Sequence, residues 1–152
     1  MQVADSHIIL TNDSTLNAKI LSPKQKIKKK YWVQVEGEIN HQALEMLKNG
    51  VEIKLAKTIY KTQKCLVLKI ERPKQLLDRI PDIRFRKNQA TSWIEITLEE
   101  GKNRQIRKML AQVNFPVLRL IRFSIQGLCI TDFNSNSIKV LNEVELIKHL
   151  RI

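Results

Sequence analysis

The sequence predicts an α+β domain, built on a largely antiparallel or mixed sheet with flanking helices. Short segments that alternate between apolar and polar residues, as strands do, are interleaved with a few helical segments. No internal repeat or low-complexity segment interrupts this order. Because 152 residues can bury a sizeable core, we expect a single domain over residues 1–152.

Several segments have the composition of strands. Residues 31–36 alternate cleanly, with Tyr31, Val33 and Val35 on one face. Residues 117–125 are also strand-like. The remaining predicted strands are a buried one at 8–10, one marked by Leu66, Leu68 and Ile70, and one marked by Ile94, Ile96 and Leu98. Residues 71–91 are polar, contain two prolines and predict a long loop.

Polar residues mark where the helices begin. Asp13 is the expected cap of a helix that reaches Ile20, and Asn142 of a helix that reaches Leu150. Asn40 precedes a helix over 42–48, which Asn49 and Gly50 end. A fourth helix follows a turn at Gly101, with Asn103 as its expected cap. Its buried face is formed by Ile106, Met109, Leu110 and Val113.

The net charge of +12 is the most unusual property of the composition. Such an excess on a folded domain most often binds a polyanion, and nucleic acid is the commonest one. A membrane surface is the competing partner. However, the sequence has no long apolar run, signal peptide or basic amphipathic helix with an aromatic face, so we expect no membrane partner.

Cysteine and histidine residues suggest no special chemistry. Cys65 and Cys129 lie far apart among apolar neighbours, as reduced cysteines of a cytoplasmic protein do. The three histidines are scattered, so we expect no metal site.

The segment from Glu99 to Met109 gathers four cations on a turn and the helix that follows it. They are Lys102, Arg104, Arg107 and Lys108. No Asp or Glu occurs between Gly101 and Thr131 to neutralise them. A solvated basic face is one interpretation, and a phosphate-binding site is the other; the missing acidic residues favour the second.

A second basic segment holds five lysines between Lys24 and Lys30. It is either a flexible solvated loop or a loop whose Lys28, Lys29 and Lys30 contact phosphates. Cations beside rings on which bases can stack favour RNA binding, with Tyr31 as the functional ring. We expect Trp32 and Trp93 mainly to cover the sheet of the domain.

Three segments together resemble the signatures of ribosomal RNA pseudouridine synthases. They are Lys-Tyr-Trp-Val-Gln-Val-Glu-Gly (30–37), Glu-Gly-Lys-Asn-Arg-Gln-Ile-Arg-Lys-Met (100–109) and Phe-Pro-Val-Leu-Arg-Leu-Ile-Arg (115–122). Residues 10–13 are similar to the end of the strand at that family's catalytic loop. Residues 81–87 and 91–94 are most like members that act on the large subunit.

The resemblance implies cofactor-free isomerisation of one uridine in large-subunit ribosomal RNA after the base has left its stack. It also implies roles for three residues: Tyr31 packs on the flipped base, Arg107 pairs with a nucleophilic Asp, and Leu128 lines the pocket. We expect the side chains of Tyr31 and Arg107 to lie within about 10 Å of each other, which one flipped base would span. We also expect a monomer.

The nucleophile itself is where the sequence departs from the family. Family members carry Gly-Arg-Leu-Asp before the strand, with the Asp ten positions ahead of the residue that corresponds to Thr11; that position is Met1 here. Asp5 is a weak substitute because it comes four residues too late. We therefore expect a domain without the family's N-terminal strand and Gly-Arg-Leu-Asp segment. The alternative is a non-catalytic RNA-binding protein on the same fold.

Overall fold

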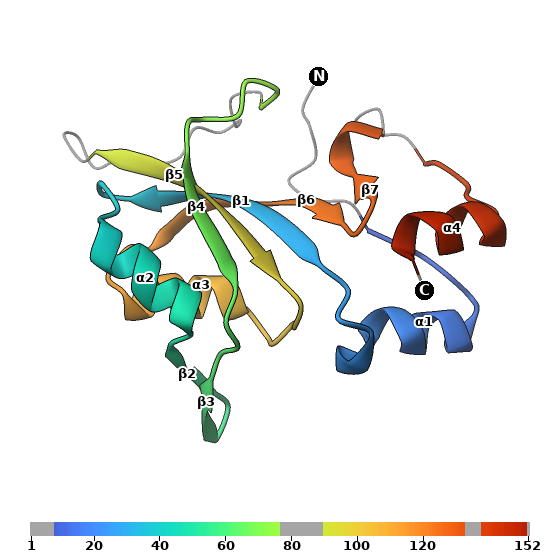
Figure 1. Ribbon diagram of the computed structural model, residues 1–152, viewed down its shortest axis with the longest axis horizontal. Coiled ribbons are helices and arrows are strands. Elements are labelled where there is room, and N and C mark those ends of the chain that lie inside the picture. Colours follow the sequence, from blue (N-terminus) through green and yellow to red (C-terminus); the bar gives the residue numbers. More distant parts are fainter. Residues whose placement is uncertain (1–7, 77–89, 133–137, 152) are drawn as a thin grey trace.

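A computed structural model describes residues 8–76, 90–132 and 138–151 (Figure 1). Five antiparallel strands form the main sheet in the order β4-β5-β1-β6-β7, and β2 and β3 form a separate hairpin. The α+β prediction is confirmed. In chain order the elements are α1 (Ser14–Leu21), η1 (Pro23–Gln25), β1 (Lys29–Glu36), α2 (His41–Asn49), β2 (Glu52–Leu55), β3 (Thr58–Lys61), β4 (Leu66–Ile70), β5 (Thr91–Leu98), α3 (Gln105–Gln112), β6 (Val117–Ile125), β7 (Leu128–Cys129), η2 (Ile130–Asp132) and α4 (Glu143–Leu150).

The predicted caps explain where three helices begin. The carboxylate of Asp13 accepts hydrogen bonds from the backbone of α1, and the side chain of Asn40 accepts one from α2. Asn142 forms a capping box with Glu145 at the start of α4. Each cap satisfies backbone N–H groups that have no partner within the helix, so the helix start is fixed locally.

The predicted cap of α3 was wrong. Arg104, rather than Asn103, precedes the helix; its backbone is left-handed, with φ of 51°, and its side chain makes no capping hydrogen bond. Instead, the side-chain oxygen of Gln105 accepts a hydrogen bond of 2.9 Å from the backbone N–H of Lys102. The turn is therefore stabilised by the side chain of the first residue of the helix.

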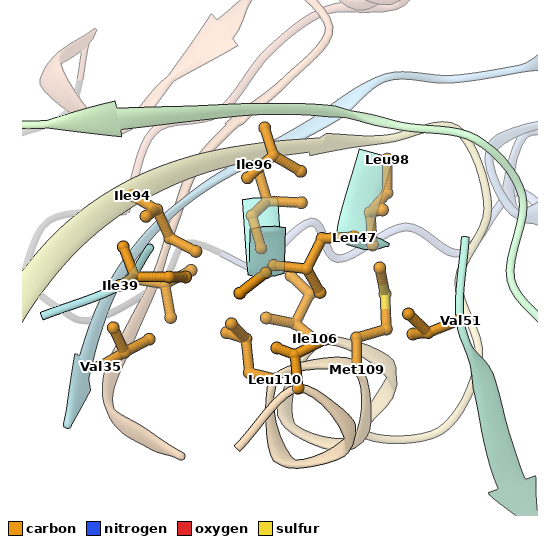
Figure 2. Packing of buried hydrophobic residues seen from close by; sticks show 14 of the residues in the cluster. Val35, Ile39, Leu47, Val51, Ile94, Ile96, Leu98, Ile106, Met109 and Leu110 are labelled. Carbon is orange, nitrogen blue, oxygen red and sulfur yellow. The ribbon is translucent and has the colours of Figure 1, made fainter. Parts of the chain in front are cut away.

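The central strand β1 pairs with β5 on one side and β6 on the other. Its Val33 and Val35 side chains face α2 and α3, where they join the main hydrophobic cluster, here called the helix-covered core. Figure 2 shows Leu47 from α2 and Met109 from α3 meeting side chains of β5 in this core. The predicted buried face of α3 is confirmed: its four apolar residues all lie in the core.

The opposite face of the sheet holds the two tryptophans. Both Trp32 and Trp93 are less than one tenth exposed and belong to one cluster. The Trp32 ring stacks on Phe123 with 4.0 Å between centroids, and its indole N–H donates to Glu95. The expectation that these indoles cover the sheet is confirmed.

A third cluster lies where α1 and α4 meet the end of the sheet, away from α2 and α3 (Figure 1). It buries Ile27 from the lysine-rich segment against Leu146 and Leu150 of α4. That segment therefore has a fixed point and is not a free loop.

Some predicted elements were wrong or missed. Residues 8–10 are not a strand, and Ile8 and Leu10 are 75% and 90% exposed, because no neighbouring strand pairs with them among the described residues. The strand at β4 is confirmed, but its inward side chain is Val67, while Leu66 and Leu68 are exposed. The short β2–β3 hairpin and β7 were not predicted. Of the expected loop, residues 77–89 lie outside the described residues.

Candidate RNA-binding and active site

The turn before α3 presents its cations to solvent. Lys102 and Arg104 are exposed, and Arg107 and Lys108 on the helix are half-buried. None of the four makes an ion pair with a carboxylate among the described residues. Since the buried face of α3 is held in the helix-covered core, these cations are presented from a rigid support.

Arg107 lies at the boundary between the core and solvent. Its Nη1 atom is 3.5 Å from the backbone carbonyl oxygen of Val117, at the start of β6. Val117 pairs with Val35 of β1 and packs against the helix-covered core. The guanidinium therefore lies on the face of the sheet that α3 covers, as a half-buried group rather than a freely solvated one.

Tyr31 is half-buried near the start of β1, on the same face. It lies opposite Arg122 of β6, whose side chain hydrogen-bonds it. Burial raises the pKa of the Tyr31 phenol, while the charge of Arg122 and its hydrogen bond act in the opposite direction. The phenol is thus kept protonated beside a fixed cation.

Lys29 adds a second cation to this region. Burial, and then the positive charge of Arg122, lower the pKa of the Lys29 ammonium. Its Nζ atom donates to the carbonyl oxygen of Ile27 at 3.2 Å. A nearby phosphate would favour the charged form of this lysine, so anion binding and protonation would reinforce each other.

Tyr31 and Arg107 share one face of the sheet. Arg107 contacts Val117, which pairs with Val35 of β1. Val35 is four residues from Tyr31 along the same strand, or about 13 Å at strand spacing. Long side chains can reach toward each other across this interval. The expected separation of about 10 Å between the two side chains stays a prediction.

Of the other expected site residues, Leu128 lies toward the same end of the sheet as Tyr31, because it pairs with Ile125 of β6, which pairs with Lys29 of β1. Leu128 is 2% exposed in β7 and packs with Ile27 and Ile125 beneath α4, in the third cluster rather than the helix-covered core. Asp5 lies outside the described residues.

The three expected RNA-binding lysines of the second segment differ in their surroundings. Lys28 is exposed, and Lys29 is half-buried beside Tyr31. Lys30 forms an ion pair of 3.2 Å with Glu95, the same carboxylate that accepts from Trp32. Because neighbouring strand residues point to opposite faces, Lys30 and Tyr31 do not share a surface.

A buried carboxylate beneath the basic turn was not predicted. Glu100 is only 7% exposed, and its oxygens accept from the Tyr60 hydroxyl at 2.5 Å, the Gln63 backbone N–H at 2.9 Å and the Gln105 side chain at 2.6 Å. This carboxylate raises the pKa of Tyr60 to about 12, chiefly through their hydrogen bond. The signal in the sequence was weak: an acidic residue directly before the Gly101 turn.

A surface hollow lies away from Tyr31 and Arg107. A surface hollow of about 890 Å³ lies beside the end of α2 and is lined by His41, Glu45 and Lys61 among others. It contains neither Tyr31 nor Arg107.

Among the described residues, no group of three or more His, Cys, Asp or Glu side chains could hold a metal ion. No helix within the described ranges is long and apolar enough to cross a membrane.

Several known proteins with similar sequences are described as pseudouridine synthases. A chain of Vibrio vulnificus strain CMCP6, named ribosomal large subunit pseudouridine synthase E, is 42% identical over 135 residues, which cover 89% of this chain and 56% of the relative. A synthase E of Xanthomonas axonopodis pv. citri strain 306 is 37% identical, over 78% of this chain and 60% of the relative. The chain thus spans little more than half the length of these relatives.

The fold is also similar to that of a solved structure. A crystal structure of a pseudouridylate synthase superposes with a TM-score of 0.67, at 19% identity, over 92% of this chain and 52% of that one. The family model described as RNA pseudouridylate synthase matches residues 7–112, which include β1, the Glu100 turn and the whole of α3. Because this family model matches more than half of the chain, the chain belongs to the RNA pseudouridylate synthase family.

Proposed function

We propose that the protein containing this chain isomerises a uridine to pseudouridine in large-subunit ribosomal RNA, without a cofactor. The observation that carries the proposal is the 42% identity to the Vibrio vulnificus large subunit pseudouridine synthase E over 89% of this chain. The net charge of +12 supports a polyanionic substrate, as do the four cations at α3, none of which forms an ion pair within the described part of the chain.

The reaction is a rearrangement within one nucleotide. The bond between uracil N1 and ribose C1′ breaks, the base turns, and a bond from C5 to C1′ forms. The proton displaced from C5 leaves, and N1 gains one, so no oxidant or further reactant is needed. The base must leave its stack before either edge can be reached.

Three residues are proposed for this step. Tyr31 stacks on the flipped base, Leu128 contributes apolar surface, and Arg107 pairs with the carboxylate that the family uses as nucleophile. A carboxylate in a dry pocket would drift toward its neutral form, and a facing guanidinium keeps it ionised. The half-buried position of Arg107 supports this role, since a solvated arginine would give much less stabilisation.

Further proposals concern partners and setting. Lys28, Lys29, Lys30, Lys102, Arg104 and Lys108 contact RNA phosphates. The protein acts as a monomer in the cytoplasm and requires neither a membrane nor a small-molecule cofactor.

The test uses the gene in its natural setting. Deleting it should remove one pseudouridine from large-subunit ribosomal RNA, mapped by carbodiimide modification and primer extension. Restoring the intact gene should return the modification, and the Arg107→Ala gene should not. The matched Lys148→Ala gene should return it, because Lys148 is exposed on α4 and is not among the proposed RNA contacts. An unchanged modification map after deletion would rule out the enzyme.

A second candidate is a non-catalytic RNA-binding protein on the same fold. The observation in its favour is that the Arg107 guanidinium contacts the Val117 backbone, a contact that requires no catalytic partner. This candidate predicts an unchanged modification map, together with salt-sensitive binding of ribosomal RNA by the chain.

A further inference from the structure

The β2–β3 hairpin projects from the domain beside α3 (Figure 1). Its Lys54 side chain, and Lys57 at its tip, are exposed, and neither makes an ion pair with a carboxylate among the described residues. Lys61 is also exposed, but it lies directly across the hairpin from Glu52. Lys54 and Lys57 therefore place positive charge toward the tip of the hairpin, away from Glu52 at its base.

The base of the hairpin is fixed to the turn that carries the α3 cations. Glu100, at the start of that turn, accepts hydrogen bonds from Tyr60 in β3 and from the backbone of Gln63 just after it. On the inner side, Ile53 of β2 is buried in the helix-covered core with α3. Polar and apolar contacts together dock the hairpin, because a buried carboxylate that lost its donors would be strongly destabilised.

The docking also brings a cation of the turn over the hairpin. The Lys102 Nζ atom lies 4.8 Å from the centre of the Tyr60 ring, within the range of a cation–π interaction. Glu100 does not expose its charge to this surface, because it is buried and its oxygens already accept three hydrogen bonds. Lys102 thus lies at the inner face of the hairpin base, and the exposed Lys54, which pairs with Ile59, lies on the outer face closer to the tip.

We propose that the β2–β3 hairpin is a second RNA-binding element, in which Lys54 and Lys57 contact phosphates next to those bound by Lys102 and Arg104. This inference rests on the proposed RNA substrate. Nucleic-acid backbones carry closely spaced charges along an extended path, so a cationic arm fixed beside a cationic turn matches them over more than one nucleotide. The hairpin would orient the RNA around the reacting uridine without touching it.

The first experiment measures binding of this chain to tiled transcripts of large-subunit ribosomal RNA at several salt concentrations. Replacing Lys54 and Lys57 together with alanine should weaken binding by roughly fivefold per lysine at about 0.1 M salt. It should also flatten the slope of log affinity against log salt by about 0.7–0.9 per lysine. Lys148→Ala, at an exposed lysine of α4, is the matched control and should change neither quantity. Equal binding by the double variant and the control would overturn the proposal.

The second experiment tests the docking. Tyr60→Phe removes the hydroxyl donated to Glu100 and keeps the ring beneath Lys102. With the hairpin loosened, the two lysine substitutions should cost clearly less affinity than in the wild-type background. An equal loss in both backgrounds would show that docking has no part in RNA binding. Thermal unfolding of each variant confirms that the compared proteins are folded.

The outcomes separate this inference from the proposed function. If the wild-type chain binds the transcripts and the double lysine variant binds them equally well, only the hairpin proposal is overturned. Loss of binding in the double variant supports the hairpin, even where gene deletion leaves the pseudouridine map unchanged. A chain that binds no transcript overturns the hairpin proposal, whereas the proposed function is decided by the pseudouridine map after gene deletion.

Discussion

The two basic segments of this chain resemble each other in sequence and differ in structure. Lys28, Lys29 and Lys30 are consecutive and lead into a strand, whereas the cations from Lys102 to Lys108 lie on a turn and a helix. The three lysines have different surroundings: Lys28 is exposed, Lys29 is half-buried beside Tyr31, and Lys30 forms an ion pair with Glu95. Of the second group, Lys102 and Arg104 are exposed on the turn, and Arg107 and Lys108 are half-buried on the helix.

The difference shows that the spacing of charges matters more than their number. Consecutive residues of a strand alternate between faces, so a run of lysines is divided across the sheet. Cations three or four positions apart on a helix lie side by side, opposite the residues that anchor it. The second pattern concentrates charge where a polyanion can bind it.

The largest expected effect separates Arg107 from its neighbour Arg104. In the intact enzyme, Arg107→Ala should reduce single-turnover pseudouridine formation by about 100- to 1000-fold, because a charge at the reacting centre is lost. RNA affinity should change much less. Arg104→Ala should show the reverse pattern, since Arg104 is exposed at the turn. Similar effects of both variants on both quantities would contradict the assignment.

The residues that anchor the two segments give the next effect. Leu110 fixes α3 and Ile27 fixes the lysine-rich segment, and both are almost fully buried. Replacing either with alanine should lower the free energy of unfolding by about 2–5 kcal/mol, measured by urea denaturation. Leu10→Ala is the control and should stay within about 0.5 kcal/mol of wild type, because Leu10 is 90% exposed. A small effect of Ile27→Ala would mean that the lysine-rich segment is a loose loop after all.

Salt dependence should rank the cations individually. Arg104→Ala and Lys28→Ala should each flatten the slope of log affinity against log salt by about 0.7–0.9. Lys30→Ala should flatten it less, because RNA must compete with Glu95 for the Lys30 ammonium. Filter binding across a salt series measures all three. A full effect of Lys30→Ala would show that RNA displaces Glu95.

The smallest effect is spectroscopic and uses the two tyrosines of the chain, one beside each basic segment. Phenolate absorbance should show Tyr60 titrating near a pKa of about 12, and Glu100→Gln should lower that pKa toward its ordinary value. Because folding raises this pKa, the stabilisation is fully present below about pH 10 and is lost as the pH rises through about 12. Tyr60→Phe leaves Tyr31 as the sole signal. An unshifted Tyr60 would contradict the buried carboxylate contact.

Local features of the fold were predictable from the sequence. The caps at Asp13, Asn40 and Asn142 act within a few residues, and the sequence therefore contains all that is needed to recognise them. The strand over 117–125 follows from its composition alone. Residues 8–10 have the same composition, but a strand also needs a neighbour, which local sequence does not reveal.

The site was predictable only in part, for the same reason. The position of Arg107 at the edge of the buried face follows from helical spacing, and the structure agrees. The pairing of Tyr31 with Arg122 depends on the register between two strands far apart in the chain. Burial of Glu100 depends on Tyr60 and Gln63, about forty residues away. No local pattern encodes either contact.

The central position of β1 has a consequence for synthesis of the protein. Its partners β5 and β6 follow it by more than fifty residues, so the strand is made long before it can pair. At about 5–20 residues per second, translation from Glu36 to Ile125 takes about 4–18 s. During this interval Trp32, Val33 and Val35 have no sheet to cover them, which makes the nascent chain a natural client for chaperones that bind apolar segments. Unlike a helical bundle, this domain cannot fold its centre as it leaves the ribosome.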